Sequence, residues 1–288
     1  MKVPKVIAIR GDSHPNMPSV RGGRIKSIDT MPVGAGRLFV VAVPIGHLGD
    51  LTIRARRILR GVGLIASEDP RVTRRLLARY RITVPLTTYF AGNYREKTAV
   101  LLQQLAQGLD VALVTDAGTP AVFDPGAYVV RAAHRARIPV VAVPGPSILT
   151  AALSVAGCEG ERVLFMGRLP SSRAVRRNLF RQARVLADTH VVLLAPQDLS
   201  RLVQEVHSWE GNRRMIILRN LTTAAEEILI TTTKRFLGAA TGVMTTALVT
   251  VIFAGMMRRA RVSTPKAGKR PGDKRGRRAT RPNRRAAG

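Results

Sequence analysis

The sequence predicts an α/β protein with two α/β domains, the first built on a mainly parallel five-stranded sheet and the second on a mixed sheet. The chain has 288 residues, enough for two ordinary domains, and 45% of them are hydrophobic. Short apolar, β-branched runs alternate with helical stretches, which is typical of a parallel sheet covered by helices. This alternation occurs on both sides of the turn Pro144-Gly145-Pro146, so we expect two domains.

Five apolar runs supply the strands of the first domain, which we expect at residues 37–157. The runs lie at 38–43, 64–67, 86–90, 111–115 and 140–143. Each is short and lacks alternating polar residues, as expected of a strand buried on both faces. One intervening helix starts with Asn93 and Glu96, spaced as in a capping box, and should end near Gly108. A short helix that ends at Gly157 closes the domain.

The second domain is expected at residues 158–257. Its strands lie at 163–166, 190–194, 215–218, 227–232 and 248–254, and its helices at 174–188 and 199–209. The last two strands suit an antiparallel finish to the sheet. Residues 237–257 are 21 positions without a charge, which raises the alternative of a membrane span. Their four Thr and three Gly favour a loop followed by a core strand, so we expect no stable membrane association.

Both ends of the chain are expected to be disordered, and the C-terminal end is strongly basic. Residues 1–36 are rich in Gly, Pro and Ser without any sustained period, and 258–288 are a low-complexity basic tail. The formal charge is +29, of which the tail carries +12. Such a chain favours a polyanion, with RNA, DNA and an anionic membrane all open.

Composition excludes several classes of protein. Cys158 is the only cysteine, so one chain can form neither a disulfide framework nor a multi-cysteine zinc site, and we expect no metal. Aromatic residues make up only 4%, which argues against a single-strand binder built on aromatic platforms. The N-terminus has no continuous apolar segment of the secretory kind, so we expect a cytoplasmic protein.

Loops of small and polar residues follow four of the first five strands. The most informative is TDAGTPAVFDPG at 115–126, and others lie at 44–50, 67–71 and 143–147. Carboxyl ends of parallel strands meet at one edge of a sheet, where ligands of α/β proteins bind against exposed backbone. Neither a P-loop nor a GxGxxG fingerprint is present, so a triphosphate is not expected.

Four ordered motifs resemble the small-subunit ribosomal RNA methyltransferases of the tetrapyrrole-methylase superfamily. They are PIGHLGDLT (44–52), ASEDPRVTRRLL (66–77), VALVTDAGTPAVFDPG (111–126) and VPGPSILTAALS (143–154). The resemblance is close over about 37–169. It implies two α/β domains of tetrapyrrole-methylase type with S-adenosylmethionine as the cofactor in the cleft between them. It also implies a homodimer that methylates a cytidine ribose 2'-hydroxyl of 16S rRNA in the small ribosomal subunit.

The resemblance also implies site residues. Those matching the cofactor contacts of the superfamily are Leu48, Ala117, Gly118, Thr119, Val122, Ser147, Ile148 and, in the second domain, Ala195. A ribose hydroxyl needs a proton acceptor, and our candidates are Glu68 and Asp69. The alternative for this acidic pair is a salt-bridged helix start in which Asp69 is the cap. RNA contacts are expected from Arg71, Arg74, Arg75 and the basic tail from Arg258.

The sequence departs from the family pattern at several places, which leaves two rival functions open. Phe90-Ala91-Gly92 replaces a His-containing run, 194–196 differ, and the element 218–222 has lost a Glu. These changes support a non-catalytic RNA-binding or ribosome-assembly protein on the same scaffold. The other rival is methylation of a precorrin-type tetrapyrrole, which the excess of positive charge disfavours.

Overall fold

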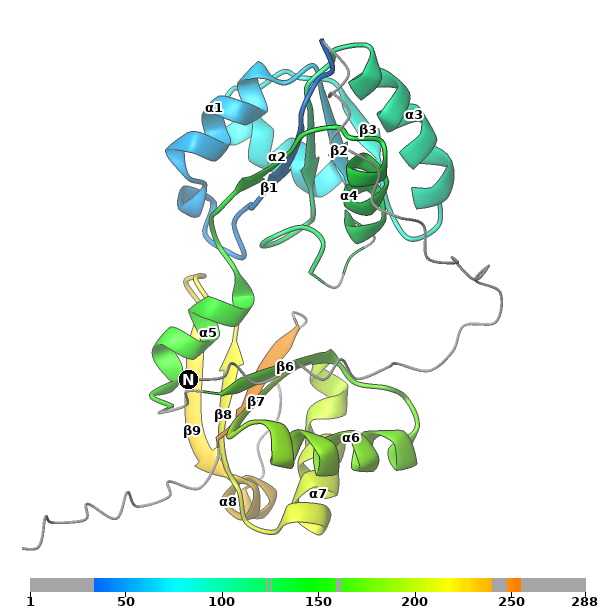
Figure 1. The fold of residues 1–288 in the computed structure, drawn as a ribbon. Coiled ribbons are helices and arrows are strands. Elements are labelled where there is room, and N and C mark those ends of the chain that lie inside the picture. The colour runs from blue at the N-terminus through cyan, green and yellow to red at the C-terminus, as the bar shows by residue number, and fades with distance from the viewer. Residues whose placement is uncertain (1–33, 123, 125, 159–161, 240–247, 255–288) are drawn as a thin grey trace, which may run out of the picture.

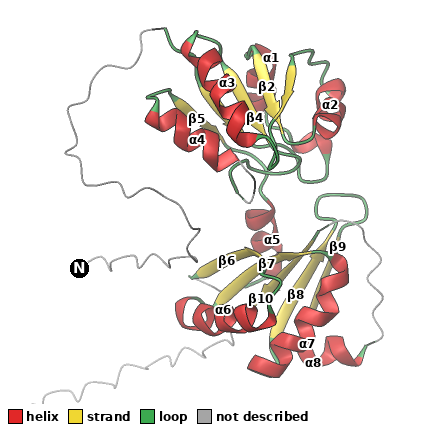
Figure 2. Ribbon diagram, turned by 90° about the vertical axis from the view of Figure 1, so that its right-hand side faces the viewer, coloured by secondary structure: helices red, strands yellow, loops and turns green. Residues whose placement is uncertain are grey.

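The computed structural model describes residues 34–122, 124, 126–158, 162–239 and 248–254. These residues form two lobes, one above the other in Figures 1 and 2. The expected tail at 258–288 and all but the last three residues of the expected extension at 1–36 lie outside the described residues.

The first lobe is a three-layer sandwich around a parallel sheet. Its strands are β1 (Leu38–Val41), β2 (Leu64–Ser67), β3 (Leu86–Thr88), β4 (Val111–Val114) and β5 (Val140–Val143). Its helices are η1 (Leu48–Asp50), α1 (Ile53–Gly61), α2 (Pro70–Arg79), α3 (Tyr94–Ala106) and α4 (Gly126–Arg135). The strand order is β3-β2-β4-β1-β5, and every pairing is parallel, as predicted.

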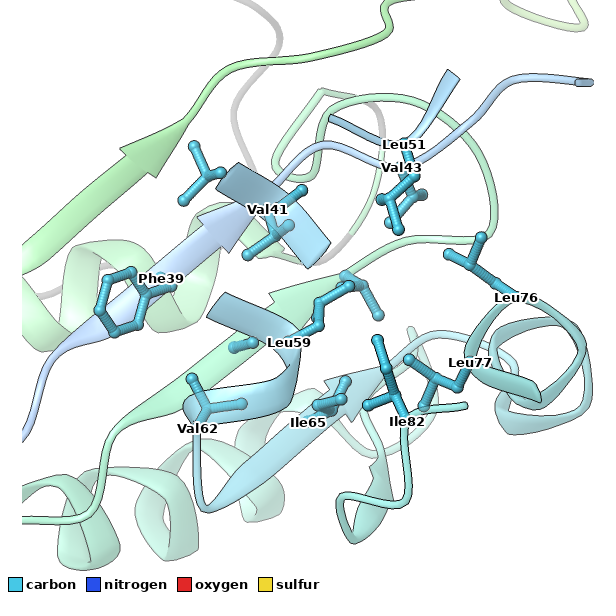
Figure 3. Packing of buried hydrophobic residues seen from close by; sticks show 14 residues of the cluster. Phe39, Val41, Val43, Leu51, Leu59, Val62, Ile65, Leu76, Leu77 and Ile82 are labelled. Carbon is cyan, nitrogen blue, oxygen red and sulfur yellow. The ribbon is translucent and has the colours of Figure 1, made fainter. Parts of the chain in front are cut away.

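Successive residues of the central strands enter different cores, which explains their uninterrupted apolar sequence. Phe39 and Val41 of β1 pack with Leu59 of α1 and Leu77 of α2 on one face (Figure 3). Leu38, on the opposite face, packs with side chains of α3 and α4. Both faces of this sheet are therefore covered by helices, as expected of a doubly wound domain.

The second lobe contains a mixed sheet. Its strands are β6 (Val163–Arg168), β7 (Thr189–Leu194), β8 (Arg214–Arg219), β9 (Glu227–Thr232) and β10 (Val249–Phe253). Its helices are α5 (Ile148–Ala156), α6 (Arg173–Leu186), η2 (Pro196–Asp198), α7 (Leu199–Glu210) and α8 (Thr233–Gly238). The order is β6-β7-β10-β8-β9. Only β6 and β7 pair in parallel, so the antiparallel finish predicted for the last two strands is confirmed.

The last strand lies at the centre of this sheet. All five residues of β10 are buried, with Val249, Val251 and Phe253 in the core formed with α7 and Ile252 in the opposite core. The charge-free segment 237–257 thus contributes a core strand, while 240–247 and 255–257 lie outside the described residues. Within the described ranges, no helix is both long enough and apolar enough to cross a membrane.

Two local expectations differ from the structure. The helix at 148–156 was expected to close the first domain, but Ala152 and Ala156 pack against Ile216 and Ile252 of the second sheet. The change from one sheet to the other therefore falls within 144–147. At the start of α3, the Asn93 side chain caps no helical N–H; instead Asn93 Oδ1 accepts from the N–H of Phe90 at 2.9 Å. The capping-box prediction is wrong there, although the helix begins at the expected residue.

Candidate active site

The site lies where the strand order of the first sheet reverses. Strands β2 and β4 are neighbours, but the chain leaves β2 toward β3 on one side and leaves β4 toward β5 on the other. The loops that follow these two strands diverge and leave a crevice at the carboxyl edge. Two backbone hydrogen bonds between Val43 and Gly118, of 2.9 and 3.0 Å, join the loop after β1 to the loop after β4. Gly118 has φ +81°, which favours glycine at this position.

A cleft of about 420 Å³ opens from this crevice toward the second lobe. The first lobe lines it with Ile45, Glu68, Thr115, Asp116, Ala117, Val122 and Asp124. The second lobe lines it with Ile148, Arg168, Leu193, Asn220, Leu221, Thr223, Leu248 and Thr250. A smaller pocket of about 160 Å³, which Leu48 helps to line, shares Ile45 and Ala117 with the cleft. The volume of the larger cleft, about 420 Å³, is in the usual range of sites for small organic ligands.

Direct contacts between the lobes close one end of the cleft. The N–H of His47 donates to Oγ1 of Thr222 at 3.0 Å. Gly46 lies so close to the second lobe that a Cβ there would sit 2.6 Å from the carbonyl oxygen of Leu221. The loop after β1 therefore tolerates only glycine at this contact. His47 also accepts from the N–H of Gly49 through Nδ1, so it acts as a loop cap.

Of the two predicted proton acceptors, Glu68 is the one that lines the cleft. Its Oε2 accepts a 2.6 Å hydrogen bond from the hydroxyl of Thr115, a buried residue at the end of β4. Two neighbouring strands, β2 and β4, thus fix this carboxylate at the mouth of the first sheet. A positioned carboxylate of this kind can accept a proton from a bound hydroxyl.

Asp69, the other predicted acceptor, is occupied by structural contacts. Its carboxylate caps α2 by accepting from the N–H of Arg71 at 2.8 Å, and it forms a 2.8 Å ion pair with the guanidinium of the same residue. These hydrogen bonds lower the pKa of Asp69 below its ordinary value. Asp69 is not among the described residues that line the cleft. The geometry therefore favours the salt-bridged helix start for Asp69.

Two further carboxylates, which the sequence patterns did not identify as candidates, also line the cleft. Burial raises the pKa of Asp116 above its ordinary value, and the charges of Glu68 and Asp69 raise it further, although a hydrogen bond from the N–H of Asp69 opposes the shift. Asp124 accepts from the N–H groups of Ala121 and Gly126 through Oδ1, while burial raises its pKa too. Asp124 therefore holds the loop after β4 in shape, and Asp116 adds negative charge beside Glu68.

The predicted cofactor residues divide into three groups. Those that line the cleft or the pocket beside it are Leu48, Ala117, Val122 and Ile148. Ala195 lines an adjoining pocket of about 460 Å³ on the second lobe, which shares Arg168 with the cleft. Gly118, Thr119 and Ser147 are not among the described lining residues. Thr119 instead donates to the carbonyl of Pro146 at 3.2 Å and ties the two loops together.

The predicted RNA contacts on α2 lie on its outer surface. Arg71, Arg74 and Arg75 are all exposed, and the Arg71 side chain is 84% exposed despite its ion pair with Asp69. They belong to the helix that begins at Pro70, shortly after Glu68. The basic tail from Arg258 lies outside the described residues.

The second-lobe wall is the part that the sequence reasoning missed. Asn220, Leu221 and Thr223 follow β8 and complete the cleft from the opposite side. Asn220 and Thr222 have positive φ values of 52° and 64°, so the loop turns sharply at two residues that are not glycine. The departure from the family pattern at 218–222 was the available signal, but it could not say which side chains face the first lobe.

Comparisons with known proteins match a part of the chain that includes residues from both walls of the cleft. Residues 37–236 match the family model of the Tetrapyrrole (Corrin/Porphyrin) Methylases. A Ribosomal RNA small subunit methyltransferase I from Pseudomonas aeruginosa is 41% identical over 197 residues, covering 68% of this chain and 70% of that protein. The protein of the same name from Thermotoga maritima is 38% identical over 195 residues, covering 67% of this chain and 86% of that protein.

Solved structures share the fold. A uroporphyrin-III C-methyl transferase from Thermus thermophilus, complexed with S-adenyl homocysteine, has a TM-score of 0.54 at 20% identity and covers 76% of this chain and 97% of its own. A diphthine synthase has a TM-score of 0.59 at 12% identity, covering 76% of this chain and 89% of its own. At these identities the likeness concerns the fold.

Proposed function

The chain belongs to the Tetrapyrrole (Corrin/Porphyrin) Methylases, and on that premise we propose that it transfers a methyl group from S-adenosylmethionine to a cytidine ribose 2'-hydroxyl of small-subunit (16S) rRNA. The cleft between the lobes is the observation that carries the proposal. It joins the loops after β1 and β4 with a carboxylate, Glu68, at one wall. The relatives named as small-subunit rRNA methyltransferases support the choice of substrate.

The residues of the cleft suit this cofactor. Ile45, Ile148 and Leu221 offer apolar walls to an aromatic base, while Ala117 leaves the backbone of the loop after β4 accessible. Asp116 and Asp124 place negative charge where a sulfonium cation and sugar hydroxyls would be favoured. When bound, S-adenosylmethionine supplies an electrophilic methyl group. The chain's contribution is alignment and exclusion of water, since no covalent intermediate is needed.

Glu68 accepts the proton of the ribose hydroxyl in this proposal. The hydroxyl is a weak nucleophile until its proton is removed, so a carboxylate held at the cleft wall lowers the barrier. Thr115 keeps one carboxylate oxygen of Glu68 in a fixed direction by its 2.6 Å hydrogen bond.

RNA is held by charge at several points. Arg71, Arg74 and Arg75 are exposed on α2, and the tail from Arg258 adds +12 without any need for sequence specificity. The family resemblance also implies a homodimer, which sedimentation of the purified protein tests directly.

Mass mapping of ribose methylation in small-subunit rRNA tests the proposal. We expect one cytidine to carry a 2'-O-methyl group in cells that contain the protein and to lack it in cells that do not. Purified protein should restore the group to subunits from the deficient cells when S-adenosylmethionine is added. Retention of subunits without methyl transfer would instead support a non-catalytic RNA-binding protein. Transfer of the methyl group to a precorrin but not to RNA would show that the substrate is a tetrapyrrole.

A further inference from the structure

A basic groove on the second lobe lies outside the proposed active site. It has a volume of about 700 Å³ and is formed by α6 and the end of α7. Arg173, Arg177, Arg181 and Arg184 line it, together with Trp209. We name these four arginines and Trp209 the α6 groove. We propose that this groove binds the phosphate backbone of the RNA substrate next to the target nucleotide, an inference that rests on the proposed function.

The sequence of α6 places its charges on one face. Arg176, Phe180 and Ala183 are buried at helical spacing, so the helix packs on the sheet through that stripe. The four groove arginines recur at intervals of three or four residues on an exposed flank of the helix beside that stripe. They span roughly 16 Å at the helical rise of 1.5 Å per residue, with neighbours spaced like successive phosphates of a nucleotide strand.

These charges are largely uncompensated within the described part of the chain. Arg177 and Arg184 have neither an ion pair nor a hydrogen-bond partner among the described residues, and Arg181 contacts only the neutral side chain of Asn178. The one acid in the groove, Glu210, is ion-paired with Arg213. Glu205, 3.9 Å from Arg173, is bound more closely by the buried Arg176. The groove is therefore a site of concentrated positive charge.

The shape and position of the groove favour a nucleotide strand over other anions. Guanidinium groups bind phosphate in bidentate fashion, and the half-buried indole of Trp209, with the Arg173 guanidinium 5.9 Å from its ring centre, adds an aromatic ring to the wall of the groove. The pocket that contains Ala195 borders the cleft through Arg168 and continues over Pro170 and Ser171 to the start of α6. A strand that leaves the cleft can follow this surface, since α6 comes directly after β6 on the same lobe (Figures 1 and 2).

Trp209 makes the proposal testable because it is the only tryptophan in the chain. Its fluorescence reports on the groove alone. We expect quenching when single-stranded RNA of the target region is added to the full-length protein. The double variant Arg177→Gln/Arg184→Gln should need about fivefold more RNA for half-maximal quenching, the effect of losing two exposed charge contacts. Its plot of log affinity against log salt should flatten by about 1.4, or 0.7 for each lost contact to a single strand.

The matched control removes the same charge from another helix. Arg131 and Arg135 are exposed on α4 of the first lobe, and Arg131→Gln/Arg135→Gln should leave both the quenching midpoint and the salt slope unchanged. Circular dichroism checks that both double variants are folded. Equal losses in the two double variants would mean that only net charge matters, and would overturn the proposal.

Two further results separate the groove from the active site and from a lipid partner. If the wild-type protein methylates the RNA without quenching of Trp209, and the α6 variant keeps the same KM, the groove proposal fails while the proposed function stands. Quenching without methyl transfer would support the groove and count against the proposed function. Val185 and Leu186 are also exposed on α6. Quenching by phosphatidylserine vesicles but not by RNA would therefore assign the groove to lipid and overturn the proposal.

Discussion

At the scale of single residues, the adjacent acids Glu68 and Asp69 make different contacts. Glu68 points to Thr115 on the neighbouring strand, whereas Asp69 turns back to cap α2 and pair with Arg71. Sequence alone could identify the pair as candidates but could not divide the roles. The division depends on which side chain meets β4 after the strands have paired.

Glu68→Gln should reduce kcat on the order of 10²- to 10⁴-fold, the usual contribution of a general base. Cofactor affinity measured by calorimetry should remain unchanged, because the amide keeps the size of the side chain. Asp69→Asn is the matched control: asparagine also caps helices, so most activity should remain. If Asp69→Asn lost as much activity as Glu68→Gln, the proton acceptor would have been assigned to the wrong residue.

Asp124→Asn should change how stability depends on pH. Burial raises the pKa of Asp124 above its value of 3.8 in the unfolded chain. The wild-type carboxyl therefore stabilises the fold most below that pH, and this contribution is lost as the pH rises through the folded pKa. The unfolding free energy of the wild type minus that of the variant should therefore be larger at pH 4 than at pH 7. Denaturant titrations at both pH values measure it, and a difference that grows with pH would contradict the burial argument.

At the scale of elements, the positions of the strands along the chain are easier to predict than their order in the sheets. Strands β1, β2 and β4 coincide closely with apolar runs because burial on both faces leaves a strong local pattern. The insertion of β10 between β7 and β8 could not be read in this way, since strand order depends on contacts between distant segments. The position of α5 was missed for the same reason. Its small residues could face either sheet until the tertiary contacts are known.

The buried ion pair between α6 and α7 gives a prediction at this scale. Arg176 binds Glu205 with both side chains less than 10% exposed, and it also donates to the carbonyls of Pro170 and Ser171. Arg176→Leu should lower the unfolding free energy by about 3–5 kcal/mol, because it leaves the buried carboxylate of Glu205 with only the guanidinium of Arg173, 3.9 Å away. The double variant Arg176→Leu/Glu205→Leu should recover part of that loss. As a control, Arg201→Leu breaks an exposed pair with Asp198 and should cost at most about 1 kcal/mol. Equal losses for the two single variants would contradict the burial argument.

At the scale of the whole molecule, the cleft exists because the two lobes meet at the loop after β1. Gly46→Ala should separate them, since the new Cβ would lie 2.6 Å from the Leu221 carbonyl oxygen and 2.7 Å from Thr222 Oγ1. Cofactor affinity should fall, while the cores of both sheets keep their packing and far-ultraviolet circular dichroism stays the same. Gly61→Ala is the control, because a Cβ there meets nothing within 4 Å. Unchanged affinity in Gly46→Ala would mean that the lobe contact does not shape the site.

The charge of the whole molecule predicts a separate role for the basic tail. Deleting residues 258–288 removes +12 of the +29 total. RNA affinity should fall and its salt dependence should flatten, because fewer counterions are released on binding. Cofactor affinity should not change, since every described residue that lines the cleft precedes the tail. Loss of both affinities would show that the tail supports the fold.

Calorimetric titration with S-adenosylhomocysteine, the demethylated product, tests the central claim most directly. Wild-type protein should bind one molecule per chain. Ala117→Trp should bind none, because Ala117 lines both the cleft and the pocket beside it. Ala106→Trp, on an exposed position of α3, should bind like wild type. Absence of binding heat in folded wild-type protein, with or without RNA, or equal binding by Ala117→Trp, would contradict a methyl-donor site between the two lobes.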